Sequence, residues 1–226
     1  LTGIKHIADE EFPASITDEE IDLIAGQCLF SQVPVALNGN GGTVDVSSLK
    51  VMQGFKVTVF DGSSFNNSSK TFTGDTNWIG SDWNDRTSSI KIEPNGKSGL
   101  SGIYKLQNRN SGKYMDLDGN NTADNTAVVQ WDNEGTELYQ QWRLNEVATG
   151  VYTIQAAATD NRGLDVAFAS SDNWAQVLLY TYNGGAHQQF ILYDKGDGYY
   201  QLIARHCGKP VEMAYASTAS GEWTKI

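Results

Sequence analysis

The 226-residue sequence lacks three features that would each point to a class of protein. It has two cysteines, Cys28 and Cys207, and neither belongs to a Cys-x-x-Cys pair, so no redox or zinc site is expected. No apolar run approaches the ~20 residues that cross a bilayer as a helix. There is no basic stretch followed by an apolar one at the start, and Leu1 stands where Met would, so we expect a processed chain or an excised fragment.

Positive charge is also scarce. Lys and Arg number 16 against 27 Asp and Glu, which gives a net charge of −11. A chain this acidic repels phosphate backbones and anionic lipids, so neither a nucleic-acid partner nor a membrane partner is expected. With 23 glycines, 11% aromatic residues and only 19% charged residues, the composition is typical of an all-β, loop-rich protein.

The first quarter of the sequence differs from the rest. Within residues 1–27, the pattern Thr17-Asp-Glu-Glu20 is a capping box, and the apolar residues 21, 23 and 24 follow it. This predicts a short helix near 18–25, inside a linker or short helical lead-in segment.

A second region, residues 28–95, has strand patterns. Short apolar or alternating runs at 33–37, 55–60, 69–72 and 88–92 are separated by glycine- and asparagine-rich turns. The turn-forming residues 94–99 then break the pattern, and we place a domain boundary there.

The third region, residues 96–226, repeats itself. The triplet 102–104 (Gly-Ile-Tyr) recurs as Gly-Val-Tyr at 150–152 and as Gly-Tyr-Tyr at 198–200, each time 48 residues further on. Each unit has short alternating strands and no helical periodicity, so none can bury its own apolar face. Three such units are expected to close around a pseudo-threefold axis, because closure shares one core and removes open sheet edges.

The third region resembles the ricin-type β-trefoil lectins, also called family 13 carbohydrate-binding modules. The resemblance rests on two Gln-x-aromatic signatures, Gln140-Gln-Trp142 and Gln188-Gln-Phe190, and on the Leu-Asp-Val-like segments before them. By the 48-residue period, the third signature falls beyond Ile226, so the third repeat is expected to be incomplete. Either its last strand lies outside this stretch of sequence, or the third unit closes in another way.

The resemblance implies a shallow sugar site in each repeat. An Asp accepts hydrogen bonds from sugar hydroxyls, an aromatic ring stacks on the apolar face of the sugar, and amide or imidazole groups complete the site. In the second repeat these residues are Asp165, Tyr180, Asn183, His187 and Gln188. In the first repeat they are Asp116, Trp131 and Gln140, with Glu134 and Tyr139 where the second repeat has Asn and His. The third repeat offers Glu212 and no aromatic platform.

Several of these residues also have a structural interpretation. We expect Trp142 and Phe190 to lie in the core, and Gln141 and Gln189 to tie turns through backbone hydrogen bonds. Asp165 could be a plain turn former, and 116–120 is interpreted as an Asp-Gly hairpin turn rather than a calcium loop.

Residues 28–95 resemble a β/γ-crystallin-type Greek-key domain, a small β-sandwich. The resemblance rests on residues 57–65 and 83–90. A full domain of this type contains two Greek-key motifs, and only the second is convincing in this sequence. It implies a possible Ca²⁺ site at Asn84, Asp85 and Ser88, where bound calcium would stabilise the fold. The alternative is that these side chains cap turns. No other cofactor is expected.

Catalysis is not expected. The three histidines (His6, His187 and His206) are scattered in the sequence, and no nucleophile elbow, zinc-protease motif or phosphate loop is present. A glycosidase needs two carboxyl groups facing each other across a cleft, whereas a trefoil offers shallow surfaces.

The sequence therefore predicts a two-module, all-β, non-catalytic carbohydrate-binding protein. We expect it to be the C-terminal targeting region of a secreted polysaccharide-degrading glycoside hydrolase, monomeric and tethered to the catalytic domain. Its partner would be a galactose-, xylose- or arabinose-containing polysaccharide. The alternatives are a protein-interaction or inhibitor scaffold with a calcium-stabilised crystallin-like module, and an intact small hydrolase.

Overall fold

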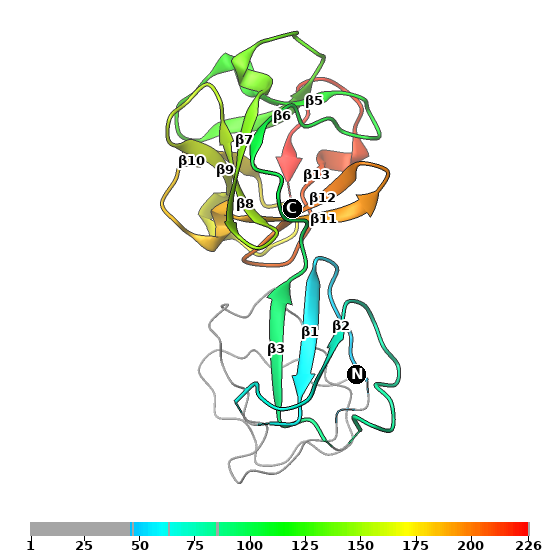
Figure 1. Cartoon of the computed structure of the whole chain (residues 1–226). Coiled ribbons are helices and arrows are strands. Elements are labelled where there is room, and N and C mark those ends of the chain that lie inside the picture. Colours follow the sequence, from blue (N-terminus) through cyan, green and yellow to red (C-terminus); the bar gives the residue numbers. More distant parts are fainter. Residues whose placement is uncertain (1–45, 47, 63, 85, 226) are drawn as a thin grey trace. The chain divides into compact units, whose positions relative to one another are not determined.

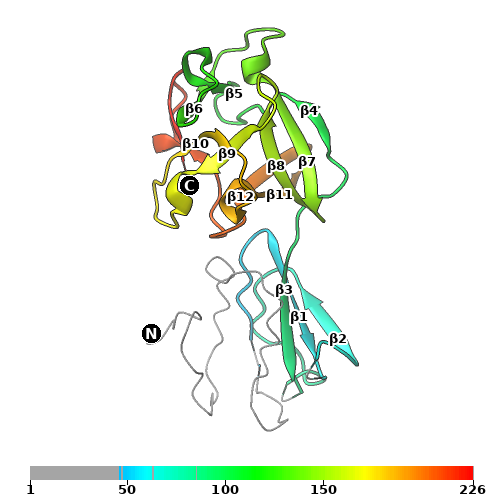
Figure 2. The same ribbon diagram turned by 90° about the vertical axis from the view of Figure 1, so that its left-hand side faces the viewer.

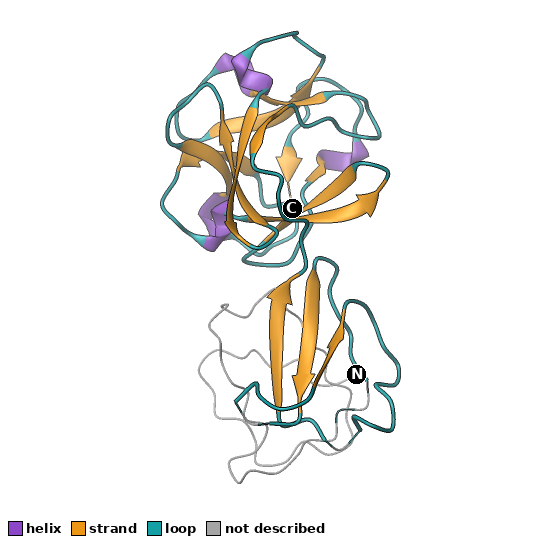
Figure 3. Ribbon diagram, in the orientation of Figure 1, coloured by secondary structure: helices purple, strands orange, loops and turns teal. Residues whose placement is uncertain are grey.

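The computed structural model describes residues 46–225 except 47, 63 and 85. The chain divides into two compact units, with the division between Asn95 and Gly96. The regular elements of the described residues are β-strands and single 3-10 turns, which confirms the all-β prediction (Figure 3). The helix expected at 18–25 and the strand expected at 33–37 lie outside the described residues, as do His6 and Cys28. Within the described part, no helix is long and apolar enough to cross a membrane.

The N-terminal unit contains a three-stranded antiparallel sheet in the order β2-β1-β3 (Figure 1). Its strands are β1 (Phe55–Phe60), β2 (Ser69–Phe72) and β3 (Ser89–Pro94). They lie where alternation predicted them, because Val57 and Val59 of the central strand point into a core that also holds Trp83. The Greek-key resemblance stays a prediction, since much of this unit lies outside the described residues.

The C-terminal unit is built from three repeats. The first contains β4 (Gly102–Tyr104), β5 (Tyr114–Leu117), β6 (Thr126–Trp131) and β7 (Trp142–Ala148). The second contains β8 (Val151–Ala156), β9 (Arg162–Val166), β10 (Val177–Thr181) and β11 (Phe190–Gly196). The third contributes β12 (Tyr199–Ala204), β13 (Glu212–Met213) and β14 (Thr224–Lys225) to the described part of the chain.

The outer strands of the repeats form one antiparallel ladder in the order β4-β7-β8-β11-β12. This ladder encloses the core, in which Trp142, Tyr152 and Phe190 are completely buried. The expectation for Trp142 and Phe190 is therefore confirmed. Burying one such ring contributes about 1.5–3 kcal/mol, so the Gln-x-aromatic signature marks a packing position.

The inner strands form three hairpins, β5–β6, β9–β10 and β13–β14, that close into a ring. Figure 2 labels the first two of them. Each hairpin contacts the next through a pair at the same place in its repeat. The three pairs are Ala127 with Leu178, Gln176 with Lys225, and Trp223 with Val129. The expected pseudo-threefold closure is confirmed, and it places the 3-10 turns of the three repeats at equivalent positions.

Candidate functional site

Two aspartates occupy the same place on the inner hairpins of the first two repeats. Asp116 lies on β5 and Asp165 on β9. Each accepts a 2.8 Å hydrogen bond through Oδ2 from the Nε2 of a glutamine at the end of a 3-10 turn: Gln140 of η2 (Leu138–Gln140) and Gln188 of η4 (Ala186–Gln188). Both partners of both pairs are buried, so the carboxylates are held in fixed positions.

These two glutamines use both hydrogens of Nε2. The second bond goes to a backbone carbonyl, at 2.7 Å to Asp132 for Gln140 and at 2.9 Å to Thr181 for Gln188. Their Oε1 atoms accept backbone N–H bonds from the loop that precedes each turn. Buried amides with both donors in use position the two aspartates. That Gln140 and Gln188 also contact a sugar stays a prediction.

The first site has an acceptor to spare. Asp116 Oδ1 is buried and has no hydrogen-bond partner among the described residues. Burial raises the pKa of this carboxyl, while the hydrogen bond from Gln140 and the charge of Lys105 oppose that rise. A buried oxygen without a donor costs free energy.

Lys105 also contacts the rim of the first site. Its Nζ lies 3.1 Å from Gln140 Oε1 and 2.7 Å from Asn133 Oδ1. Tyr139, which stands where the second repeat has a histidine, packs against the core instead. The first site is therefore flanked by a cation and has no imidazole.

The second site contains two histidines. His187 Nε2 lies 3.4 Å from Asp165 Oδ2, and the rings of His187 and His206 are 6.4 Å apart in an edge-to-face arrangement. The two histidines are separate in the sequence, and the fold brings His206 of the third repeat beside His187. Burial raises the pKa of Asp165, which the charge of His187 and the bond from Gln188 oppose. Burial lowers the pKa of His206, whose Nε2 lies 2.9 Å from the Ser170 carbonyl.

An accessible aromatic ring accompanies each aspartate. Trp131 ends β6 and Tyr180 lies near the end of β10, and both are partly open to solvent. In the loop that follows each ring, an asparagine Oδ1 accepts a backbone N–H bond two residues on: Asn133 from Gly135 at 3.1 Å, and Asn183 from Gly185 at 2.9 Å. The ring, the carboxylate and the amide are the groups that an amphipathic sugar requires.

Asn133 is a polar residue of the first-site loop that the sequence reasoning missed. It stands two residues after Trp131, whereas Asn183 stands three residues after Tyr180, so a fixed offset from the ring gave Glu134. The Asn-x-Gly pattern shared by Asn133-Glu-Gly135 and Asn183-Gly-Gly185 is the signal that identifies it.

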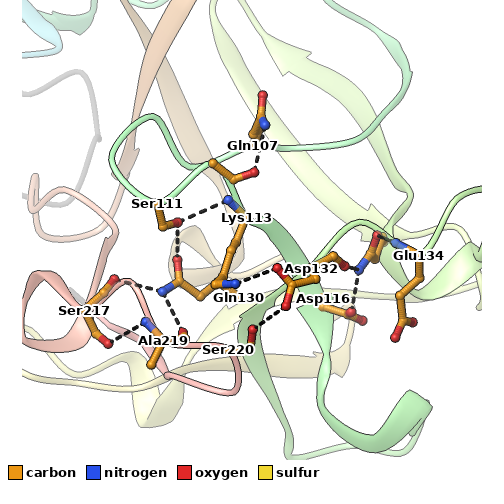
Figure 4. Close-up of polar contacts among 12 residues, drawn as sticks. Gln107, Ser111, Lys113, Asp116, Gln130, Asp132, Glu134, Ser217, Ala219 and Ser220 are labelled. Atoms are coloured by element: carbon orange, nitrogen blue, oxygen red, sulfur yellow. Dashed lines mark hydrogen bonds and ion pairs between the residues drawn. The ribbon is translucent and has the colours of Figure 1, made fainter.

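The first site is braced by the third repeat (Figure 4). Gln130, the residue before Trp131, is buried and donates through Nε2 to the carbonyls of Ser217 and Ala219 at 2.8 and 2.9 Å. Ser220 Oγ donates to Oδ2 of Asp132, the residue that follows Trp131, at 2.9 Å. The second repeat has Leu179 at the place of Gln130, so this bracing belongs to the first site.

Other expected residues have structural roles or little support. Gln141 and Gln189 donate to the carbonyls of Thr136 and Gly184, which confirms that they tie turns. Of the calcium residues, Asp85 lies outside the described part, and Ser88 donates its backbone N–H to Phe60. The described residues hold no group of three His, Cys, Asp or Glu side chains that could bind a metal. The calcium site, which also includes Asn84, stays a prediction.

Solved structures resemble this chain. The designed three-fold symmetric protein ThreeFoil is 41% identical over 54% of this chain and 86% of its own, with a TM-score of 0.53. The exo-β-1,3-galactanase 1,3Gal43A from Clostridium thermocellum is 27% identical over 83% of this chain, with a TM-score of 0.53. This chain spans 44% of that enzyme. A mosquitocidal holotoxin, 17% identical over 64% of this chain and 17% of its own, with a TM-score of 0.52, shares the fold.

A comparison with curated protein sequences gives no match. The model of one family, described as ricin-type beta-trefoil lectin domain-like, matches residues 90–180 and 138–226. These matches cover more than half of the chain and all of the residues that form the two sites. Such a lectin-like domain is non-catalytic, as the sequence predicted. The chain belongs to the ricin-type β-trefoil lectin-like family.

Proposed function

We propose that the C-terminal unit binds carbohydrate without catalysis, through the first and second sites. The observation that carries this proposal is the twofold occurrence of one arrangement: a buried carboxylate held by a buried glutamine, beside an accessible aromatic ring. The ring offers a flat apolar surface and the carboxylate offers a directional acceptor, so together they suit a sugar. No cofactor is required for this chemistry.

The polymer proposed as ligand contains galactose, xylose or arabinose, and galactan is the first choice. The similarity to a galactanase supports this choice, since it extends over more of this chain than the C-terminal unit contains. We further propose that the two units are the targeting region of a secreted polysaccharide-degrading glycoside hydrolase. Tethering would raise the effective concentration of the enzyme on its substrate, and two weak sites would add avidity.

Affinity electrophoresis through gels that contain soluble β-1,3-galactan, arabinoxylan or no polysaccharide tests the proposal. The variants are Trp131→Ala and Tyr180→Ala, singly and together, with Trp78→Ala as the control. Trp78 is an exposed tryptophan of the N-terminal unit, so its loss should not matter. Wild type should be retarded, each single variant less so, and the double variant least of all.

If wild type migrates alike in every gel and its melting curve shows a folded protein, the sugar-binding proposal is wrong. If the double variant is retarded as strongly as wild type, the first and second sites are not where the polysaccharide binds. In the first case the trefoil would be better understood as a scaffold for a protein partner, the alternative from a different class.

A further inference from the structure

A buried apolar residue lies beside the aspartate of the first site and of the second. Val129 is the cross-strand partner of Asp116, and Leu178 is the partner of Asp165. Both apolar residues are buried, but neither belongs to the core of the C-terminal unit. Because opposite residues of antiparallel strands point to the same face of a sheet, each of them shares the outer face of its hairpin with the aspartate.

The same face continues into the neighbouring repeat, and there the two sites differ. Opposite Val129 lies Trp223 of the third repeat, and opposite Leu178 lies Ala127 of the first. Trp223 is 57% exposed, so its ring is accessible beside the first site. At the second site a methyl group takes that place. Across the strands, the first site therefore has an aspartate, a valine and a tryptophan, and the second has an aspartate, a leucine and an alanine.

The segment that carries Trp223 also borders the aromatic ring of the first site. Gly221 has a φ of 80°, and a Cβ atom at this position would lie 3.3 Å from Trp131 Cζ3. The glycine thus lets the backbone approach the ring closely. Two backbone hydrogen bonds hold the segment to β6: Gln130 donates to the Glu222 carbonyl at 3.1 Å, and Gly221 donates to the Gln130 carbonyl at 2.8 Å. Trp223 is therefore held against the strand that carries Trp131.

The spacing of these groups suits more than one sugar unit. Neighbouring strands lie about 4.8 Å apart, so two strand spacings, roughly 10 Å, separate the backbone of Asp116 from that of Trp223. A pyranose ring is shorter than this distance. A single sugar bound to Asp116 and Trp131 therefore leaves Trp223 to the next sugar of a chain, whose apolar face a second aromatic ring suits.

We propose that Trp223 extends the first site to a second sugar unit. The first site then selects a chain of at least two sugars, whereas the second site, with Ala127 at the equivalent position, holds a single unit. Trp223 is thus a specificity-determining residue that the third repeat contributes to the site of the first. The proposal rests on the proposed function and deepens it, because it states the length of ligand that each site prefers.

The test compares a monosaccharide with its disaccharide at each site. Isothermal titration calorimetry uses galactose with β-1,3-galactobiose, xylose with xylobiose, and arabinose with arabinobiose. Tyr180→Ala leaves the first site to be measured alone, and Trp131→Ala leaves the second. For at least one of the three pairs, the first site should bind the disaccharide roughly three- to tenfold more tightly than the monosaccharide, the gain expected from one added ring contact. The second site should bind both alike.

Variants of Trp223 separate a binding role from a structural one. In the Tyr180→Ala background, Trp223→Ala should abolish the preference for the disaccharide and leave the affinity for the monosaccharide unchanged. Trp223→Phe keeps a ring and should keep most of the preference. Trp174→Asn is the matched control, because Trp174 is 56% exposed, its ring centroid lies 5.0 Å from that of Tyr215 in the third repeat, and asparagine suits its left-handed backbone (φ 75°). This control should leave the preference intact.

Each failure has its own signature. If no disaccharide binds the first site more tightly than its monosaccharide, while a polysaccharide retards wild type in the gels, the extension is overturned and the proposed function stands. The extension is also overturned if Trp223→Ala leaves the preference unaltered, or weakens the binding of both sugars equally, which would indicate a structural role. If neither site binds any of these sugars and no polysaccharide retards wild type, the proposed function fails and the extension fails with it.

Discussion

The first and second sites have the same interior and different rims. In both, a buried glutamine donates to a buried aspartate over 2.8 Å. At the rim, the first site has Lys105 and the second has His187 and His206. The comparison teaches that the buried pair fixes where the acceptor lies, whereas the rim can change without disturbing the fold. Ligand choice is therefore expected to differ between the repeats while the binding geometry does not.

The largest expected effect comes from breaking the shared interior. Gln140→Leu or Gln188→Leu removes the donor to a buried carboxylate and leaves backbone groups unpaired, which should lower the free energy of unfolding by about 2–3 kcal/mol. Urea denaturation measures this loss. Gln141→Leu is the control, because its one bond ties an exposed turn and its loss should cost under about 1 kcal/mol. Equal losses for Gln140→Leu and Gln141→Leu would contradict the positioning role.

The next effect concerns the acceptor itself. Asp165→Asn keeps the size of the side chain but removes the charge, and a charge-assisted hydrogen bond is worth about 1.5–3 kcal/mol, so affinity at the second site should fall roughly 10- to 100-fold. Isothermal titration calorimetry in a Trp131→Ala background isolates this site. Asp160→Asn removes the same charge from an exposed position of the same repeat and should leave affinity unchanged. A plain turn-forming role for Asp165 predicts no loss.

A pH titration sharpens the contrast between the rims. Burial raises the pKa of both Asp116 and Asp165 above the usual 3.8, so each site should lose its carboxylate, and its affinity, at a pH above that value as the solution is acidified. His187 and His206 hold the pKa of Asp165 down, and the charge of Asp124 raises it. His187→Ala should therefore move the midpoint of the second site to higher pH.

The control for that titration is the other site. Tyr139→Ala changes no charge near Asp116, so the midpoint of the first site should stay where it is in wild type. Affinity measured at half-unit steps of pH, with the opposite site blocked, gives both midpoints. A His187→Ala midpoint that is unchanged or lower would show that the imidazole does not act on the carboxylate.

The smallest effect concerns the bracing of the first site. Ser220→Ala removes one exposed hydrogen bond to Asp132, so the free energy of unfolding should change by no more than about 0.5 kcal/mol. Affinity at the first site should fall at most about twofold, and affinity at the second site should not change. Calorimetry with each site blocked in turn makes the comparison. A larger loss at the second site would mean that the repeats are coupled.

Much of this architecture can be predicted from the sequence, because a repeated sequence pattern identifies positions that are structurally equivalent. The 48-residue period indicated three units, and the Gln-x-aromatic signature predicted the buried rings of Trp142 and Phe190. A sequence period identifies equivalent positions in the repeats. It does not show which non-equivalent residues of neighbouring repeats are in contact, so it did not predict that His206 lies beside His187.

The missed features have two physical origins. The Trp174–Tyr215 pair joins two repeats, and a period inside one repeat does not show such contacts. The other misses lie within a repeat. The asparagine follows its ring at a different spacing in the first two repeats, which exchanged Asn133 for Glu134, and the burial of Gln140 and Gln188 depends on how the chain folds over them.

The ring of hairpins also has a consequence for the timing of synthesis. Its second and third junctions are made by Lys225 and Trp223, which are joined to partners in the second and first repeats. The ring cannot close until these residues have left the ribosome. Until then, the exposed edges of the first two hairpins are open to pairing with other nascent chains. The C-terminal unit therefore cannot complete its fold before the last hairpin has been synthesised. We expect a chain that stalls before residue 223 to bind chaperones.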